Sequence, residues 1–175
     1  MKILLLGKDG QVGHELKRTL LPLGDVHAFG RQGANLENLE ALRELLAQQA
    51  PDIIVNAAAY TAVDKAETNQ DVARTVNADA VAEIARYAKE NDALFVHYST
   101  DYVFDGRKEA PYDIDDQTNP QSVYGSTKLA GEAAITASGC KALILRTSWV
   151  FSAHGGNFIK TILRLAKERD ALNIV

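Results

Sequence analysis

Short apolar runs alternate along the chain with longer segments whose apolar residues recur at helical spacing. This alternation is typical of repeated βαβ units, in which the strands run parallel and the helices cover the sheet. We therefore expect an α/β fold, a Rossmann-like doubly wound parallel sheet with helices on both faces. The predicted strands are residues 2–6, 25–29, 52–56, 94–99, 142–147 and 172–175. The predicted helices lie near residues 11–21, 36–49, 71–90, 122–137 and 157–168, the last capped by Asn157.

No internal repeat, low-complexity tract or Ser/Gly linker divides the 175 residues, so we expect one domain over 1–175. The formal net charge of −4, without a run of five like charges, argues against nucleic acid as a partner. The apolar run 3–6 is too short for a signal peptide or a membrane span. The single cysteine, Cys140, cannot form an internal disulfide, which is typical of a cytoplasmic protein.

Three glycines, Gly7, Gly10 and Gly13, follow the first predicted strand and lead into the first predicted helix. Glycine at such a turn lets the backbone N–H groups approach a pyrophosphate, and the helix N-terminus favours the negative charge. A tight turn without a ligand is the alternative. Because the motif lies in the first βαβ unit, we interpret it as a dinucleotide fingerprint.

The second predicted strand ends without the acidic residue that accepts the ribose hydroxyls in NAD-binding relatives of this unit. Arg31 follows it instead, and its guanidinium could pair with a 2′-phosphate, helped by Lys8. We therefore expect NADPH to be favoured over NADH. A solvated loop cation is the alternative for Arg31.

Two further groups of residues are predicted at the carboxyl edge of the sheet, where open parallel sheets bind ligands. After the third strand, Ala59, Tyr60 and Thr61 would lie against the nicotinamide half of the cofactor. The fourth strand runs into Ser99 and Thr100. Tyr124 and Lys128, four residues apart, share one helical face, so the ammonium is expected to lie near the phenol, favour phenolate and support proton transfer.

Five sequence strings together resemble the dTDP-4-dehydrorhamnose reductases, a family of the extended short-chain dehydrogenase/reductases, over the whole chain. They are GKDGQVG (7–13), VNAAAYTAVDKAE (55–67), STDYVFDG (99–106), YGSTKLAGE (124–132) and RTSWVF (146–151). The resemblance implies NAD(P)H-dependent reduction of the 4-keto group of dTDP-4-dehydro-L-rhamnose, a dTDP-linked 4-keto-6-deoxysugar, for the synthesis of cell-surface polysaccharide precursors such as lipopolysaccharide O-antigen.

The resemblance also implies roles for individual residues. Thr100 would polarise the keto group, Tyr124 would protonate the product, and Lys128 would contact Tyr124 and the nicotinamide ribose. The implied substrate contacts are Val63, Thr100, Asp101 and Trp149. The implied cofactor contacts are Gln11 and Val12 at the pyrophosphate, Asn35 and Leu36 at the adenine, and Tyr98.

Glu15 matches a residue that in some relatives helps to hold Mg²⁺ at a dimer interface, so a homodimer with Mg²⁺ is a further expectation. A solvated glutamate is the alternative. Since members of the family are longer, we expect 1–175 to be the N-terminal part of a reductase whose C-terminal substrate lobe is absent, and the isolated piece to be inactive.

Two other functions stay open on the same scaffold. One is a sugar-nucleotide epimerase or 4,6-dehydratase, which is disfavoured because Asp101 is followed by Tyr102 and not by a second acid. The other is a non-catalytic NADP-binding regulatory subunit, against which the intact Thr100, Tyr124 and Lys128 argue.

Overall fold

Five parallel strands form one sheet in the order β2-β1-β3-β4-β5. The computed structural model describes residues 1–169 and 171–172. The strands are β1 (Lys2–Leu6), β2 (Asp25–Phe29), β3 (Ile53–Asn56), β4 (Leu94–Thr100) and β5 (Lys141–Thr147). The predicted strands through 147 are confirmed to within a residue at each end. The sixth, 172–175, lies outside the described residues except for Leu172, which is not in a strand.

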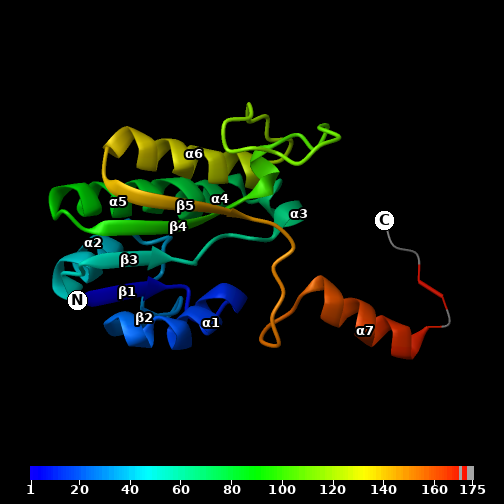
Figure 1. Cartoon of the computed structure of the whole chain (residues 1–175), viewed down its shortest axis with the longest axis horizontal. Helices are drawn as coiled ribbons and strands as arrows, with labels where there is room; N and C mark the ends of the chain where they lie inside the picture. Colours follow the sequence, from blue (N-terminus) through cyan, green and yellow to red (C-terminus); the bar gives the residue numbers. More distant parts are fainter. Residues whose placement is uncertain (170, 173–175) are drawn as a thin grey trace.

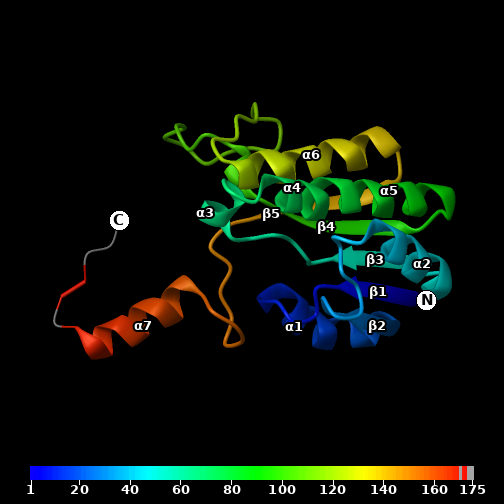
Figure 2. The same ribbon diagram turned by 180° about the vertical axis from the view of Figure 1, so that it is seen from behind.

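Helices cover both faces of the sheet, whereas α7 extends away from it (Figures 1 and 2). Leu4 and Leu6 of β1 face a layer made by α2, α5 and α6, whereas Ile3 and Leu5 face α1. Successive side chains along a strand point to opposite faces of the sheet, which is why these two pairs face different helices. The α-helices are α1 (Gln11–Thr19), α2 (Leu39–Gln49), α3 (Val63–Ala66), α4 (Gln70–Arg74), α5 (Ala80–Glu90), α6 (Val123–Ser138) and α7 (Phe158–Glu168). The expected doubly wound α/β fold is confirmed.

Two helix predictions differ from the structure. The second helix begins at Leu39 and not at 36, because the side chain of Asn38 accepts a hydrogen bond from the N–H of Ala41 and caps it there. The continuous helix expected over 71–90 is interrupted by a π-helical turn, Thr75–Asp79, between α4 and α5. Such turns insert one extra residue into a helix and are frequent at functional sites.

The direction in which strands are added to the sheet reverses between β1 and β3, because β2 lies on one side of β1 and β3 on the other. At this reversal the loops after the two strands diverge and leave a crevice at the carboxyl edge, which is where ligands bind in open α/β sheets. The glycine turn after β1 and the alanines after β3 flank this crevice. In the described residues no helix has both the length and the apolar content needed to cross a bilayer.

Candidate functional site

A cavity of about 710 Å³ lies at the carboxyl edge of the sheet, within the usual size range of ligand pockets. It brings together residues from every predicted group. They come from the glycine turn after β1, the loops after β2 and β3, the end of β4, and α6. The predicted site residues that line it are Gly7, Gly10, Gln11, Val12, Arg31, Asn35, Leu36, Ala59, Tyr60, Thr61, Val63, Tyr98, Thr100, Asp101, Tyr124, Lys128 and Trp149. Gly13 and Glu15 are not among the lining residues.

The three glycines of the turn have different reasons to be glycine. Gly7 has φ +86°, and a Cβ there would lie 2.6 Å from the backbone nitrogen of Ala58. A Cβ on Gly13 would lie 2.7 Å from the carbonyl carbon of Gly7, so Gly13 lets α1 pack onto the turn. A Cβ on Gly10 would come no nearer than 3.5 Å to the protein, at Gly7 O. Gly10 is therefore not required by packing, and it caps α1 without a side chain, beside the cavity.

The loop after β2 carries charge of both signs. Arg31 forms a hydrogen-bonded ion pair with Glu37, and both side chains line the cavity. The Arg31 side chain is 78% exposed, so the pair is weakly held. A Cβ on Gly30 would collide with the carboxylate of Asp9, which therefore lies against the end of β2. The sequence shows no acid at that strand end, yet the fold brings two carboxylates to it.

The loop after β3 is held by the π-helical turn. Asn77, at the centre of that turn and almost wholly buried, accepts a hydrogen bond from Tyr60 N at 2.9 Å and donates one to Tyr60 O at 3.1 Å. It also contacts the hydroxyl of Thr127 on α6 at 3.2 Å. One side chain thus fixes both backbone groups of Tyr60, which explains why this loop is ordered without regular structure of its own.

The end of β4 places Thr100 and Asp101 beside Tyr124. The hydroxyl of Thr100 accepts from Tyr102 N at 3.1 Å and donates to Asp101 Oδ1 at 3.2 Å. Burial raises the pKa of Tyr124, which the Thr100 hydroxyl counteracts and the Asp101 charge reinforces. The pKa of this phenol is thus raised, in the direction opposite to the one expected from a neighbouring Lys128 ammonium. The phenol is the stable form.

Lys128 explains that difference, because its amine is bound elsewhere. Its Nζ donates to Tyr98 O at 2.7 Å and lies 3.1 Å from Nε2 of His97. The side chain is 1% exposed, and burial lowers its pKa to about 8, against the opposing charge of Glu132. Burial and the neighbouring Lys128 together lower the pKa of His97 well below its usual value. The helical spacing correctly puts Tyr124 and Lys128 in one cavity but does not identify the partners of the amine.

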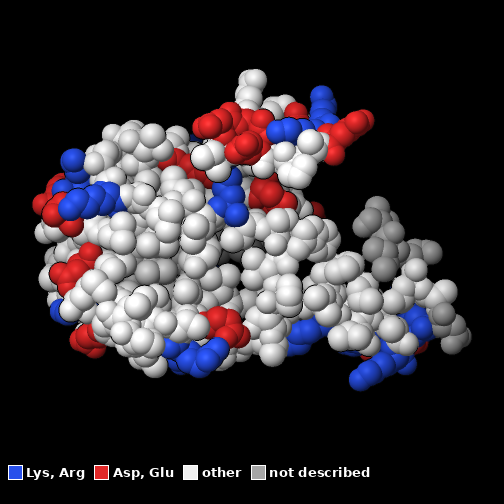
Figure 3. Space-filling view, in the orientation of Figure 1, with Lys and Arg blue, Asp and Glu red and all other residues white. Residues whose placement is uncertain are grey.

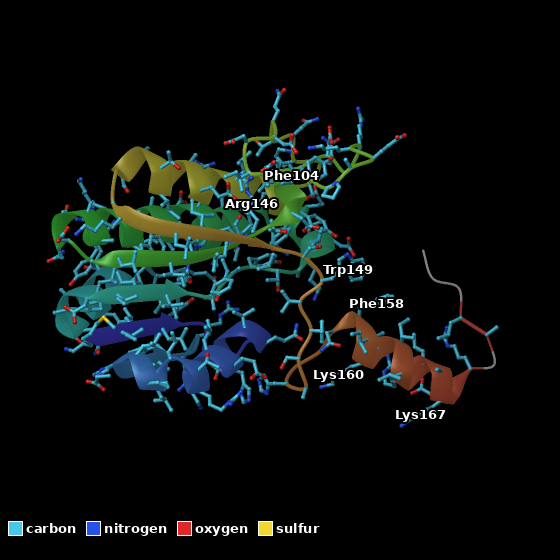
Figure 4. The ribbon with its side chains drawn as sticks, in the orientation of Figure 1. Phe104, Arg146, Trp149, Phe158, Lys160 and Lys167 are labelled. Carbon is cyan, nitrogen blue, oxygen red and sulfur yellow. The ribbon has the colours of Figure 1, made fainter. Side chains whose placement is uncertain are left out.

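A buried carboxylate fixes α6 against the sheet. Glu132 accepts two hydrogen bonds from Arg146, at 3.0 and 2.6 Å, and one from Ser99 Oγ at 2.5 Å. Arg146 in turn stacks over the ring of Phe104, with its guanidinium carbon 5.0 Å from the ring centre (Figure 4). This arrangement joins β4, β5 and α6 directly behind Thr100.

The segment that follows β5 crosses toward α1. Trp149 is 75% exposed and meets the ring of Phe158 edge-on, with 5.1 Å between ring centres (Figure 4). Beyond it, Ser152 Oγ donates to Glu15 Oε1 at 3.0 Å and Asn157 Nδ2 donates to Gln11 Oε1 at 3.0 Å. These bonds attach the segment 152–157 to the first helix and close one side of the cavity.

Glu15 does not meet other metal-binding groups. Its partners are Ser152 and Arg18, and no cluster of three or more His, Cys, Asp or Glu side chains within residues 1–169 and 171–172 is placed to hold a metal ion. Mg²⁺ takes several oxygen ligands, and within these residues Glu15 supplies one carboxylate.

Outside the cavity, the charged side chains of segment 105–117 gather on one side of the molecule, at the top of Figure 3. They bind one another: Lys108 pairs with Asp116, and the hydroxyl of Tyr112 donates to Asp105 at 2.9 Å. The segment has two basic residues against five acidic ones, so it carries a formal net charge of −3; they are Arg107 and Lys108 against Asp105, Glu109, Asp113, Asp115 and Asp116.

The sequence analysis missed Asn56, His97, Asp9 and Glu37. Asn56 ends the apolar run of β3 and His97 interrupts that of β4, and burial of such a polar group requires a hydrogen-bond partner. That signal could have identified them. Asp9 and Glu37 lie in loops, where no periodicity indicates which side chains converge.

The family model described as "RmlD substrate binding domain" matches residues 1–175. The dTDP-4-dehydrorhamnose reductase of Burkholderia thailandensis is 51% identical over 175 residues, which are 100% of this chain and 59% of that protein. The crystal structure of a dTDP-4-dehydrorhamnose reductase from Clostridium acetobutylicum superposes with a TM-score of 0.94 at 39% identity, over 98% of this chain and 61% of that one.

A dTDP-4-dehydrorhamnose reductase from Bacillus anthracis, solved in complex with NADP, gives a TM-score of 0.91 at 36% identity, over 96% of this chain and 60% of that one. The chain thus spans about three fifths of the length of these relatives. The resemblance inferred from the five sequence strings is confirmed. The match of the family model to the whole sequence means that the chain belongs to the RmlD substrate binding domain family.

Proposed function

We propose that the chain is the NAD(P)H-binding part of a reductase that converts dTDP-4-dehydro-L-rhamnose to dTDP-L-rhamnose. One observation carries this proposal: a single cavity is lined by the glycine turn at one end and by Thr100, Tyr124 and Lys128 at the other. The names of relatives that are about 50% identical supply the substrate class.

The cavity fits a dinucleotide. Gly10 has no side chain and leaves open space beside the cavity, although the protein itself would tolerate a Cβ there. The N-terminus of α1 offers backbone donors and a favourable dipole to a pyrophosphate in that space. The small side chains Ala57, Ala58 and Ala59 line the middle of the cavity. When bound, the nicotinamide supplies the hydride. We expect residues 1–175 to act as one such binding domain.

The chain's own residues supply the proton and the orientation of the keto group. Tyr124, kept as a phenol by burial, has a proton to give to the oxygen that becomes the product alcohol. The Thr100 hydroxyl lies in the same cavity. It can rotate so that it donates its hydrogen bond to the keto oxygen and no longer to Asp101. Trp149 offers an exposed aromatic face to the deoxysugar.

We propose NADPH as the favoured cofactor, because Arg31 is exposed at the cavity and can exchange Glu37 for a phosphate at small cost. Its pairing with Glu37 is the argument for NADH. A Mg²⁺ site at Glu15 is not part of the proposal, because the described residues do not form one. A homodimer and a cytoplasmic location remain predictions, the second supported by the free thiol of Cys140.

The test is Tyr124→Phe in the whole protein, followed by NADPH absorbance with dTDP-4-keto-6-deoxy-L-lyxo-hexose. Loss of the proton donor should lower turnover by about 10²-fold or more, with NADPH affinity nearly unchanged. Tyr87→Phe, on α5 and outside the cavity, is the matched control. Retained turnover in the Tyr124 variant would reject the assignment. NADPH binding without turnover in the parent protein would favour the regulatory subunit.

A further inference from the structure

Trp149 has a backbone conformation that bulky residues rarely adopt. Its φ is +52°, in the left-handed region that favours glycine. In the described chain, Ala50 and Asp92 are the other non-glycine residues with positive φ. Ala50 caps the end of α2, and Asp92 lies in the turn before β4 with a short polar side chain that tolerates this region. Neither explanation applies to Trp149, which follows a strand. Strain of this kind persists only where the surrounding structure imposes it, and it is concentrated at ligand sites.

No backbone hydrogen bond imposes this conformation in the part of the chain that the structure describes. The pairing of β4 with β5 ends at Thr100 and Thr147, and the hydrogen bonds of the turns and loops include none from the backbone of residues 148–151. Side chains hold Trp149 instead. Ser148 precedes it, and the indole meets the ring of Phe158 edge-on (Figure 4).

The side chain of Ser148 reaches from the end of β5 to the end of β4. Its hydroxyl donates to Oδ2 of Asp101 at 2.6 Å, a distance typical of a hydrogen bond to a charged oxygen. One residue earlier, the hydroxyl of Thr147 donates to Ser99 O at 3.1 Å. These two bonds continue the contact between the strands to the residue directly before Trp149, so they restrict the backbone at the point where the chain turns.

The carboxylate of Asp101 is held by both strand ends at once. Its Oδ1 accepts from the hydroxyl of Thr100 at 3.2 Å, and its Oδ2 accepts from Ser148. All three residues line the cavity together with Trp149. Under the proposed function the Thr100 hydroxyl rotates to the keto oxygen, which leaves Oδ1 free to accept from a hydroxyl of the ligand. The bond from Ser148 to the other oxygen keeps the carboxylate in place during this exchange.

We propose that Ser148 is a positioning residue that holds Asp101 and the strained backbone of Trp149 in the arrangement that receives a sugar, before the sugar is bound. A carboxylate accepts from hydroxyl groups, and an exposed aromatic face packs on C–H groups, so the pair is complementary to the two kinds of surface that a sugar presents. Because the arrangement exists in the free protein, the ligand does not have to order the turn when it binds. The choice of a sugar rests on the proposed function, whereas the role of Ser148 in the free protein does not.

The experiment is ¹⁹F NMR of the protein labelled with fluorotryptophan, without cofactor or substrate. Trp149 is the single tryptophan of the 175 residues, and its signal is assigned by its loss in Trp149→Phe. In the parent protein we expect one narrow signal, displaced from its position in urea. In Ser148→Ala the signal should broaden and move toward the position in urea, because the turn is no longer held. Ser148→Thr keeps the hydroxyl and should restore the parent signal. An unchanged signal in Ser148→Ala would overturn the inference.

Two further variants test whether Ser148 acts through Asp101. Ser138→Ala removes another hydrogen-bonded serine hydroxyl, at the far end of α6, and should leave the Trp149 signal unchanged. Asp101→Ala should move the signal as Ser148→Ala does, and the double variant should move it no further. Additive effects of the two substitutions would show that Ser148 acts independently of Asp101, and would contradict the proposal.

Kinetics of the whole protein test the consequence for the ligand. Ser148→Ala should raise KM for the dTDP-linked 4-keto-6-deoxysugar roughly tenfold, with a smaller change in kcat and no change in NADPH affinity, and Ser148→Thr should restore KM. A raised KM with an unchanged Trp149 signal would mean that Ser148 contacts the ligand directly, which would overturn the positioning role. If the protein proves to lack reductase activity, the ¹⁹F signal still decides whether Ser148 holds Trp149, so the two failures are distinguishable.

Discussion

Replacing Gly10 and Gly13 separately by alanine should separate the glycine needed for a ligand from the glycine needed for packing. At Gly13 the new Cβ would collide with Gly7 O, its nearest neighbour. It would also lie 2.7 Å from Gly7 C and 2.9 Å from Lys8 Cα, about 1 Å inside the roughly 3.5–4.0 Å that carbon atoms prefer. These are backbone atoms of a tight turn and cannot move independently. At Gly10 the nearest atom is 3.5 Å away and φ is −78°, which alanine adopts without strain.

The expected magnitudes follow from those distances. Overpacking at Gly13→Ala should cost about 1–3 kcal/mol, which corresponds to roughly 2–12 °C in Tm for a domain of this size. Gly10→Ala should change the unfolding free energy by less than about 0.5 kcal/mol. It should weaken NADPH binding at least about tenfold, because a methyl group would displace a charge-assisted hydrogen bond to the pyrophosphate.

Circular dichroism during heating and titration of NADPH fluorescence measure the two effects on the same samples. The variants are controls for each other, since both carry one added methyl in one turn. The reasoning would be refuted by a Gly13→Ala chain as stable as the parent, or by a Gly10→Ala chain that binds NADPH as tightly as the parent.

Three further predictions concern charge. Arg31→Ala should weaken the binding of NADPH by about 1–3 kcal/mol and hardly change the binding of NADH. Glu37→Gln should modestly strengthen NADPH binding, because it frees the Arg31 guanidinium. Equal effects on the binding of both nucleotides in parallel titrations would exclude a 2′-phosphate contact. The hydrogen bond from Arg43 lowers the pKa of Glu83 from 4.5 to about 2, so Glu83 contributes stability above pH 4.5 that is lost as the pH falls toward 2; Glu83→Gln should show a smaller loss in urea unfolding at about pH 3 relative to about pH 7. Lys128→Met should reduce both turnover and cofactor affinity in the whole protein, and unchanged affinity in a binding titration would remove the ribose contact.

The sequence predicted the elements that local chemistry determines. The first five strands and the cap at Asn157, whose side chain accepts from Lys160 N, follow from residue type and spacing alone. The π-helical turn around Asn77 was not predictable in this way, because it depends on a loop 17 residues away whose backbone groups it satisfies. Its neighbours in sequence carry an ordinary helical pattern.

The same distinction holds within the site. The spacing of Tyr124 and Lys128 correctly places them on one helix face, but the partners of Lys128 come from β4, across a packing interface. The carboxylate of Glu67 accepts from Val123 N at the start of α6, 56 residues away, although other helices lie nearer to it in sequence. Which helix end a carboxylate meets is a property of the tertiary fold.

The attachment of segment 152–157 to the first helix has a consequence for the order of folding. Ser152 and Glu15 are 137 positions apart, and Asn157 and Gln11 are 146 apart. Contacts between residues this distant in sequence close large loops, and the entropy cost of closing them is not offset until the elements between them have folded. The cavity wall beside the glycine turn should therefore form among the last features of this domain, and nucleotide affinity would report the completion of the fold rather than its beginning.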